Sequence, residues 1–100
     1  MINGLTEKEN EFIQAHKEIA AENCGAETWT DLAADNHSCA TVGDFEEKTD
    51  FSRRQIAGLI RSLVDKGVIV LEERECDATL YWINDYFVEE MAKQEAKAKA

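Results

Sequence analysis

The chain has 100 residues, 44% of them apolar, a size and composition that suit a single domain with one modest core. Its net charge of −10 opposes binding to phosphate unless the charge is unevenly distributed. The sequence contains neither a run of about 18 apolar residues nor a basic segment leading into an apolar one, so we expect no membrane span, no signal peptide and a cytoplasmic location.

Residues 1–40 predict an N-terminal helix and a connecting segment. Thr6 and Glu9 have the spacing of a capping box, and an apolar stripe continues to about Ala21 through Phe12, Ile13, Ile19 and Ala20. We expect this helix to pack across the helices that follow. His16 lies near the stripe, and a partly buried structural role is favoured over catalysis because no nucleophile or acid partner is recognisable.

The connecting segment is less regular. Residues 23–25 predict the end of the first helix, residues 28–34 predict a short helix, and residues 35–38 predict a loop. Trp29 and Leu32 are expected to point inward from the short helix, although an exposed Trp29 that contacts a partner is an alternative.

Residues 41–51 predict a short helix and a tight turn. Thr41 and Asp44 resemble a second capping box, Phe45 is the apolar anchor, and the helix should end near Thr49. We expect Asp50 to adopt the positive φ that such a turn often requires.

Residues 52–66 predict the clearest helix of the chain. Ser52 and Gln55 form a capping box, and Phe51 and Ile56 are spaced for a hydrophobic staple. Its apolar face comprises Ile56, Leu59, Ile60, Leu63 and Val64, and its opposite face comprises Arg54, Gly58 and Arg61. Gly67 predicts a left-handed helix end, with Leu63 and Val68 spaced for the accompanying contact.

The C-terminal third predicts a β-hairpin and a last helix. Residues 68–71 and 79–83 are expected to pair as antiparallel strands around an acidic tip, residues 72–78, whose one basic residue is Arg74. From Asp85 the pattern is helical, and residues 92–100 predict a frayed, solvated end. This helix carries an apolar cluster of Tyr86, Phe87, Val88 and Met91. Tyr86, Phe87 and Met91 should pack either on the first helix of the same chain or on a second subunit, in a homodimer that also uses the first helix.

The central segment resembles the winged helix-turn-helix family, in particular MarR-type regulators and small uncharacterised winged-helix proteins of phages and mobile elements. The residues that carry the resemblance are Val42, Phe45, Thr49, Phe51, Ser52, Arg53, Ile56, Leu59, Leu63, Lys66, Gly67 and Ile69. Glu46 departs from the family, which often has a small residue there.

The resemblance covers about half of the chain and implies its architecture. It implies a mainly α fold with a small β-hairpin, in which a three-helix core is followed by a two-stranded wing and a C-terminal helix. The single domain spans residues 1–100, with the helix-turn-helix and wing in 41–84 and the C-terminal helix in 85–100.

The charge distribution favours DNA binding through helix 52–66. Residues 52–66 carry +3, whereas residues 1–30, 31–51 and 67–100 carry −4, −5 and −4. Arginine can bind guanine and glutamine can bind adenine in the major groove, and a glycine would let the helix approach base edges. The candidate DNA-binding residues are Ser52, at a phosphate, Arg53, Arg54, Gln55, Gly58, Arg61 and, from the wing, Arg74. Double-stranded DNA as partner would imply a transcription regulator, by resemblance usually a dimer on a two-fold site.

Other interpretations stay open. The arginines could be an ordinary solvated face, and Gly58 could serve close helix packing. The net charge and acidic wing favour an alternative function, an interaction module or inhibitor that binds a basic protein. Neither an enzyme nor a cofactor is expected, because no nucleophile motif or phosphate loop is present. A metal site would have to use Cys24, His37, Cys39 and Cys76, which lack paired spacing, so reduced thiols are favoured.

Overall fold

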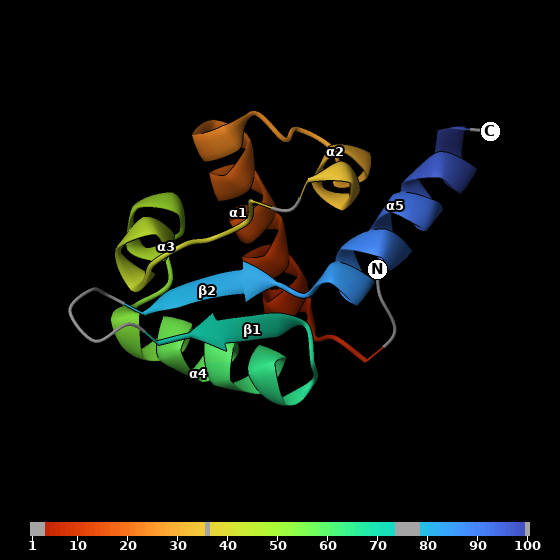
Figure 1. The fold of residues 1–100 in the computed structure, drawn as a ribbon. Coiled ribbons are helices and arrows are strands. Elements are labelled where there is room, and N and C mark those ends of the chain that lie inside the picture. The colour runs from red at the N-terminus through yellow and green to blue at the C-terminus, as the bar shows by residue number, and fades with distance from the viewer. Residues whose placement is uncertain (1–3, 36, 74–78, 100) are drawn as a thin grey trace.

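The computed structural model describes residues 4–35, 37–73 and 79–99, which form five helices and one two-stranded antiparallel sheet (Figure 1). In chain order the elements are α1 (Glu7–Cys24), α2 (Trp29–Ala34), α3 (Val42–Lys48), α4 (Arg53–Asp65), β1 (Ile69–Glu72), β2 (Leu80–Ile83) and α5 (Asp85–Lys99). The prediction of a mainly helical chain with a small antiparallel sheet is confirmed. Within the described residues, no helix combines the length and the apolarity needed to cross a membrane.

The helix starts follow the predicted capping chemistry. Reciprocal capping boxes begin α1, α3 and α4 at Thr6, Thr41 and Ser52, where a hydroxyl oxygen accepts from the backbone three residues on. Thr28 caps α2 by accepting from the Asp31 N–H. These bonds satisfy donors that a first helical turn leaves free, which is why short polar motifs set the boundaries.

The turn between α3 and α4 differs from the prediction at Asp50. No described non-glycine residue, Asp50 included, has a positive φ. The Thr49 hydroxyl donates to the Phe45 carbonyl and accepts from the Phe51 N–H, at 2.8 and 3.4 Å. Since Thr49 and Ser52 are both extended, with ψ of 165° and 160°, the chain reverses without a left-handed residue.

The end of α4 matches the predicted glycine stop. Gly67 has a φ of 76°, and the N–H groups of Gly67 and Val68 donate to the carbonyls of Val64 and Leu63. This pattern closes the last turn and directs the chain into β1. The left-handed backbone at position 67 therefore favours glycine, whereas Gly58 has no positive φ.

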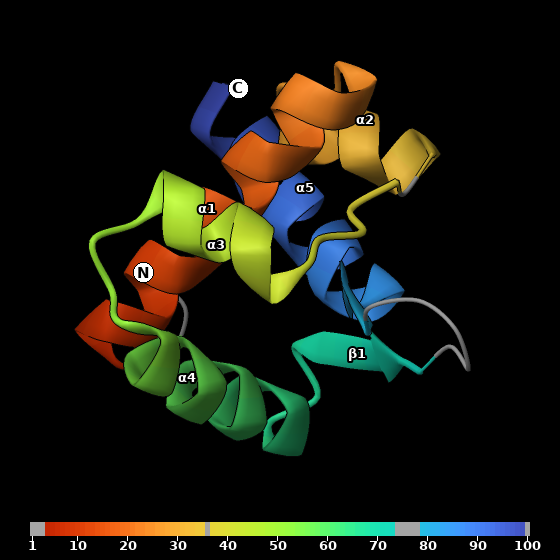
Figure 2. The ribbon, with the colours of Figure 1, turned by 90° about the vertical axis from the view of Figure 1, so that its left-hand side faces the viewer.

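The core lies where α1 crosses α3 and α4. Phe12 of α1 stacks on Phe45 of α3 with ring centroids 4.2 Å apart, and both rings are fully buried. Ile56 and Leu63 of α4 are also fully buried. Figure 2 shows α4 and α2 on opposite sides of the molecule, with α1 running between them. The side of α4 that carries Arg54, Gly58 and Arg61 is exposed.

The two strands β1 and β2 lie above α4 in Figure 1 and cover this side of the core. Ile69 pairs with Ile83 and Leu71 with Tyr81, and both isoleucines are buried. The backbone of Ala40 forms two hydrogen bonds with Tyr81, at 3.0 and 2.9 Å. This pairing attaches the segment before α3 to the sheet and fixes α3 and α4 relative to the strands.

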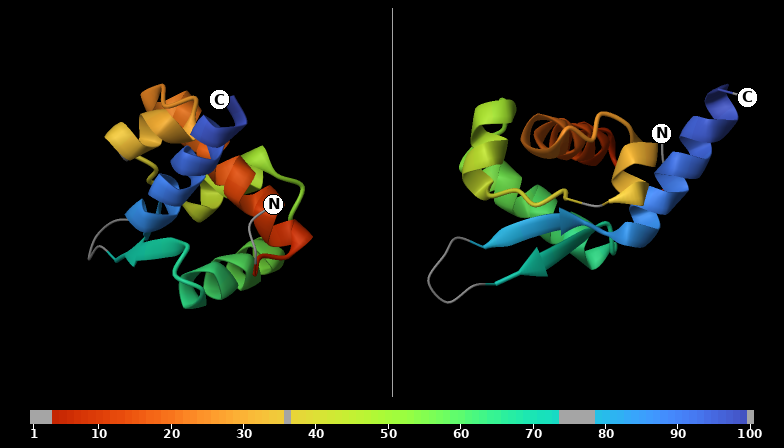
Figure 3. Two further views of the ribbon diagram at one scale, coloured as in Figure 1. Left: turned by 90° about the vertical axis from the view of Figure 1, so that its right-hand side faces the viewer. Right: turned by 45° about the horizontal axis from the view of Figure 1, so that its top comes forward.

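The C-terminal helix packs on α2 instead of α1, the intrachain neighbour that we expected. The Phe87 ring meets Trp29 edge to face, with centroids 5.9 Å apart, and Met91 is half-buried against the core, whereas Tyr86 is 80% exposed. Helix α5 continues to Lys99, and its last turns extend beyond the other helices (Figure 3). Residues 92–99 are not simply a solvated end, because Glu95 binds the first turn of α2.

Candidate nucleic-acid interface

The outer face of α4 is the candidate interface. The inner face of the helix is anchored by Ile56, Ile60 and Leu63, which are buried, so the opposite side is exposed. Arg54, Gly58 and Arg61 are all exposed there, as the spacing predicts. We call these three residues the α4 face. Its arginines lie seven residues apart, about 10 Å along the helix axis.

The two arginines of the α4 face have free guanidinium groups. Among residues 4–35, 37–73 and 79–99, no carboxylate forms an ion pair with Arg54 or Arg61. Both side chains are exposed, so a phosphate or a guanine could reach them without displacing a protein group.

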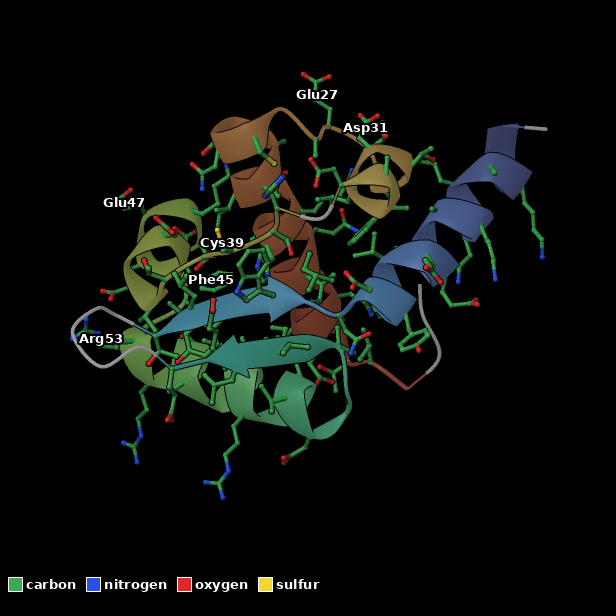
Figure 4. The ribbon with its side chains drawn as sticks, in the orientation of Figure 1. Glu27, Asp31, Cys39, Phe45, Glu47 and Arg53 are labelled. Atoms are coloured by element: carbon green, nitrogen blue, oxygen red, sulfur yellow. The ribbon has the colours of Figure 1, made fainter. Side chains whose placement is uncertain are left out.

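Arg53 differs from Arg54 and Arg61. Its Nε donates to Glu46 Oε1 at 3.1 Å, from side chains that are 78% and 41% exposed. Figure 4 shows Arg53 and Glu47 directed outward, whereas Phe45 points into the molecule. Glu46, the residue at which the predicted resemblance to winged helix-turn-helix proteins is weakest, therefore neutralises one of the predicted contact arginines.

Lys66, the fourth basic residue of the segment 52–66, also forms an ion pair, with Glu9. Its ammonium donates to Glu9 Oε1 at 2.6 Å and to the Gly4 carbonyl at 2.8 Å. Ser62 donates to Glu9 Oε2 at 2.7 Å, and Glu9 is 2% exposed. Burial by itself raises the pKa of Glu9, but hydrogen bonds from Lys66, Thr6 and Ser62 outweigh it and lower the pKa to about 2. Lys66 therefore holds α4 to α1 and is not available to a ligand.

Ser52 and Gln55 are used mainly for capping. Gln55 Oε1 accepts from the Ser52 N–H at 2.8 Å, and Ser52 Oγ accepts from the Gln55 N–H at 3.2 Å. A bidentate contact with adenine needs the amide oxygen of glutamine as well as its nitrogen. Gln55 would have to leave the capping box to read adenine, whereas the Ser52 hydroxyl can still donate to a phosphate.

The glycine of the α4 face has no packing role within the described residues. A Cβ built on Gly58 meets nothing within 4 Å, so the alternative of close helix packing is wrong. Glycine in a helix interior costs about 1 kcal/mol relative to alanine. The described part of the chain offers no compensation for that loss.

The sheet contributes no described cation to the interface. Arg74 lies outside the described residues. Glu72 and Glu73 are exposed, and the indole N–H of Trp82 donates to Glu72 Oε2 at 3.0 Å. The described part of the predicted wing is therefore acidic and apolar.

An apolar concavity of about 280 Å³ separates α4 from the sheet. Arg61 and Asp65 are its charged members, and the rest of its lining is Val42, Ala57, Ile60, Val64, Leu71 and Tyr81. Leu71 is 44% exposed. The concavity adjoins the α4 face through Arg61, and spacing along the sequence did not predict it because its lining comes from four elements, α3, α4, β1 and β2.

A second hollow, of about 570 Å³, lies between α1 and the turn after α3. Four carboxylates line it, those of Glu7, Glu11, Glu18 and Asp50, together with one ammonium, that of Lys48. Glu27 and Asp31 extend the acidic surface at the end of the molecule opposite α4 (Figure 4). Part of the negative charge therefore lies away from the α4 face, whereas Glu46 and Asp65 are carboxylates close to it.

His16 is buried more deeply than the partly buried position that the sequence predicts, and its hydrogen bond joins separate elements. The ring is fully buried, its Nε2 donates to the Ser38 carbonyl at 2.5 Å, and Ser38 Oγ accepts from the Ile83 N–H. Burial lowers the pKa of His16 to about 4, although the carbonyls of Ser38 and Tyr81 favour the protonated ring. The network joins α1, the segment before α3 and β2.

The thiols and the second histidine are dispersed. Cys24 Sγ donates to the Ala20 carbonyl at 2.9 Å, and His37 Nε2 lies 2.9 Å from Asp35 Oδ2. Cys76 lies outside the described residues. In the part of the chain that is described, no three His, Cys, Asp or Glu side chains gather as metal ligands would.

No protein-family model, curated protein or solved structure matches this chain.

Proposed function

We propose that this protein binds double-stranded DNA as a winged helix-turn-helix regulator of transcription, with α4 in the major groove. The observation that carries the proposal is the α4 face, on which Arg54 and Arg61 are exposed and make no ion pair with any described residue. Helix, turn, helix and paired strands follow one another in the order that the family resemblance implies.

The charge balance makes the expected affinity modest. With Arg53 and Lys66 engaged by carboxylates, α4 offers two free arginines. Few phosphate contacts give a weak dependence of affinity on salt, because each contact contributes about −0.9 to the slope of log K against log salt. The acidic side of the molecule further slows encounter with DNA at low salt.

The test is binding of the full chain to a random duplex library at low salt, followed by affinity measurements on the recovered duplexes. Arg54→Ala with Arg61→Ala should abolish selection and reduce the salt slope by about 2. Lys93→Ala with Lys97→Ala removes the same charge from exposed positions of α5 and should change neither. Equal losses in both double variants would contradict a role for the α4 face.

A second function is favoured by the acidic hollow between α1 and the turn after α3. Its four carboxylates could bind a basic segment of another protein, which is how an acidic inhibitor would compete with nucleic acid. Absence of duplex binding at low salt, together with binding of a lysine- and arginine-rich peptide that Glu11→Gln and Glu18→Gln weaken, would favour this function over DNA binding.

A further inference from the structure

The centre of the α4 face has no group that can read hydrogen bonds on a base edge. Gly58 lies between Arg54 and Arg61, and the exposed residue beside it, Ala57, ends in a methyl group. The backbone N–H and C=O groups in the middle of a helix are already bonded within it. Arginine side chains can reach donors and acceptors on either side, but the middle of the face can make only apolar contacts.

The fold does not require a glycine at position 58, so we look to a ligand for the reason that glycine is present there. Gly58 has no positive φ, and its built Cβ meets no described atom within 4 Å, so alanine would fit the free protein. Because glycine has no side chain, it leaves space on the exposed helix surface where other residues would place a Cβ, and we call this space the notch. Ala57 borders the notch and also lines the apolar concavity, so carbon extends from the notch toward the sheet.

We infer that Gly58 is a specificity-determining residue, and that its notch receives the C5-methyl group of a thymine. The inference rests on the proposed function. In the major groove the base edges carry donors, acceptors and a single apolar group, the thymine methyl. A helix surface with no donor or acceptor can distinguish base pairs only through that methyl. Arg54 and Arg61, four residues before and three after Gly58, hold the duplex against the notch.

The experiment replaces thymine by deoxyuridine, one position at a time, in duplexes that the full chain recovers from a random library. The replacement removes a methyl group and keeps every hydrogen bond. One position should lose affinity by about fourfold, the value for one buried methyl group. At every other thymine the change should be within error.

Variants of the protein link that position to Gly58. Gly58→Ala fills the notch with a methyl group, so it should weaken binding to the thymine duplex and bind the deoxyuridine duplex at least as well. Its melting temperature should rise, which excludes misfolding as the cause. Gly43→Ala is the matched control, because Gly43 is an exposed helical glycine of α3 whose built Cβ makes one ordinary contact, 3.6 Å from Thr41 Oγ1. It should keep the preference of the unmodified chain.

The outcomes separate the two proposals. If duplexes are recovered and every deoxyuridine substitution is tolerated, the inference about Gly58 is overturned and DNA binding stands. A methyl effect that persists in Gly58→Ala also overturns it. If no duplex is recovered, the proposed function fails and the inference fails with it.

Discussion

At the scale of single residues, the proposed DNA interface depends on which cations are neutralised. The sequence predicts DNA contacts for Arg53, Arg54 and Arg61 alike, but the carboxylate of Glu46 engages only Arg53. The pair is exposed, so it contributes about 0 to 1 kcal/mol to stability. Its main consequence is electrostatic, because it removes one free guanidinium from the end of α4 that would enter a groove first.

Glu46→Gln is therefore expected to strengthen DNA binding. The change frees Arg53 for a phosphate, so affinity should rise about two- to fivefold and the slope of log K against log salt should steepen by about 1. Fluorescence anisotropy with a labelled duplex at several salt concentrations measures both. Glu47→Gln is the control, since Glu47 lies on the same helix, points outward (Figure 4) and pairs with no described cation. An equal gain in both variants would mean that net charge alone matters.

At the scale of elements, the two shortest helices depend on tertiary contacts. Helix α2 has six residues and α3 has seven, lengths that are not stable in isolation. The Phe45 ring holds α3 through Phe12, and α5 holds α2 through the ring of Phe87 and the carboxylate of Glu95. Glu95 accepts from the N–H groups of Trp29 and Thr30, both at 3.3 Å, and from the Thr30 hydroxyl at 2.8 Å. A carboxylate at a helix N-terminus also interacts favourably with the helix dipole.

Glu95→Ala is expected to lower the free energy of unfolding by about 1 kcal/mol, the usual effect of losing a helix cap. Urea unfolding followed by tryptophan fluorescence measures it, and Trp29 lies at the affected helix end. Glu89→Ala has the same charge change and helix propensity on an exposed position of α5, and it should be nearly neutral. Equal effects would show that the contact with α2 adds nothing.

At the scale of the whole molecule, acid should weaken the fold through His16. Its pKa is about 4 in the folded protein and 6.5 in an exposed chain. Between these values the unfolded state binds a proton that the folded state does not, so stability falls as the pH is lowered through the window. The expected loss is about 3 kcal/mol, measured by urea unfolding at a series of pH values.

The second histidine provides the control for this pH dependence. His37 is exposed, so His37→Gln should keep the slope, whereas His16→Gln should remove it even though it lowers stability at neutral pH. Glu9, with its pKa lowered to about 2, begins to lose its contribution below about pH 4.5, so it adds to the loss only at the acid end of this window. A flat profile for the unmodified chain between about pH 6.5 and 4 would contradict a buried, neutral His16.

The sequence by itself determined where the helices start and the face that α1 and α4 bury, but not the packing of α5, on which Tyr86 is exposed. Ser52 with Gln55 and Gly67 defined α4 at both ends, because caps are hydrogen bonds between residues within one turn of each other. Apolar spacing identified the buried side of α4 for the same local reason. Asp50 was predicted incorrectly, because the Thr49 hydroxyl supplied a turn that needs no left-handed residue.

Only the tertiary structure decided which of the charged and polar groups are free. Lys66 meets Glu9 across 57 positions and Glu95 meets Thr30 across 65, separations over which residue spacing carries no information. The same holds for Ser38, buried between His16 and Ile83. Local hydrogen bonds depend on neighbours in the chain, whereas an ion pair depends on which elements pack together. The order of the helices could thus be predicted from residue patterns, but the reduction of four basic side chains on the 52–66 segment to two free arginines could not.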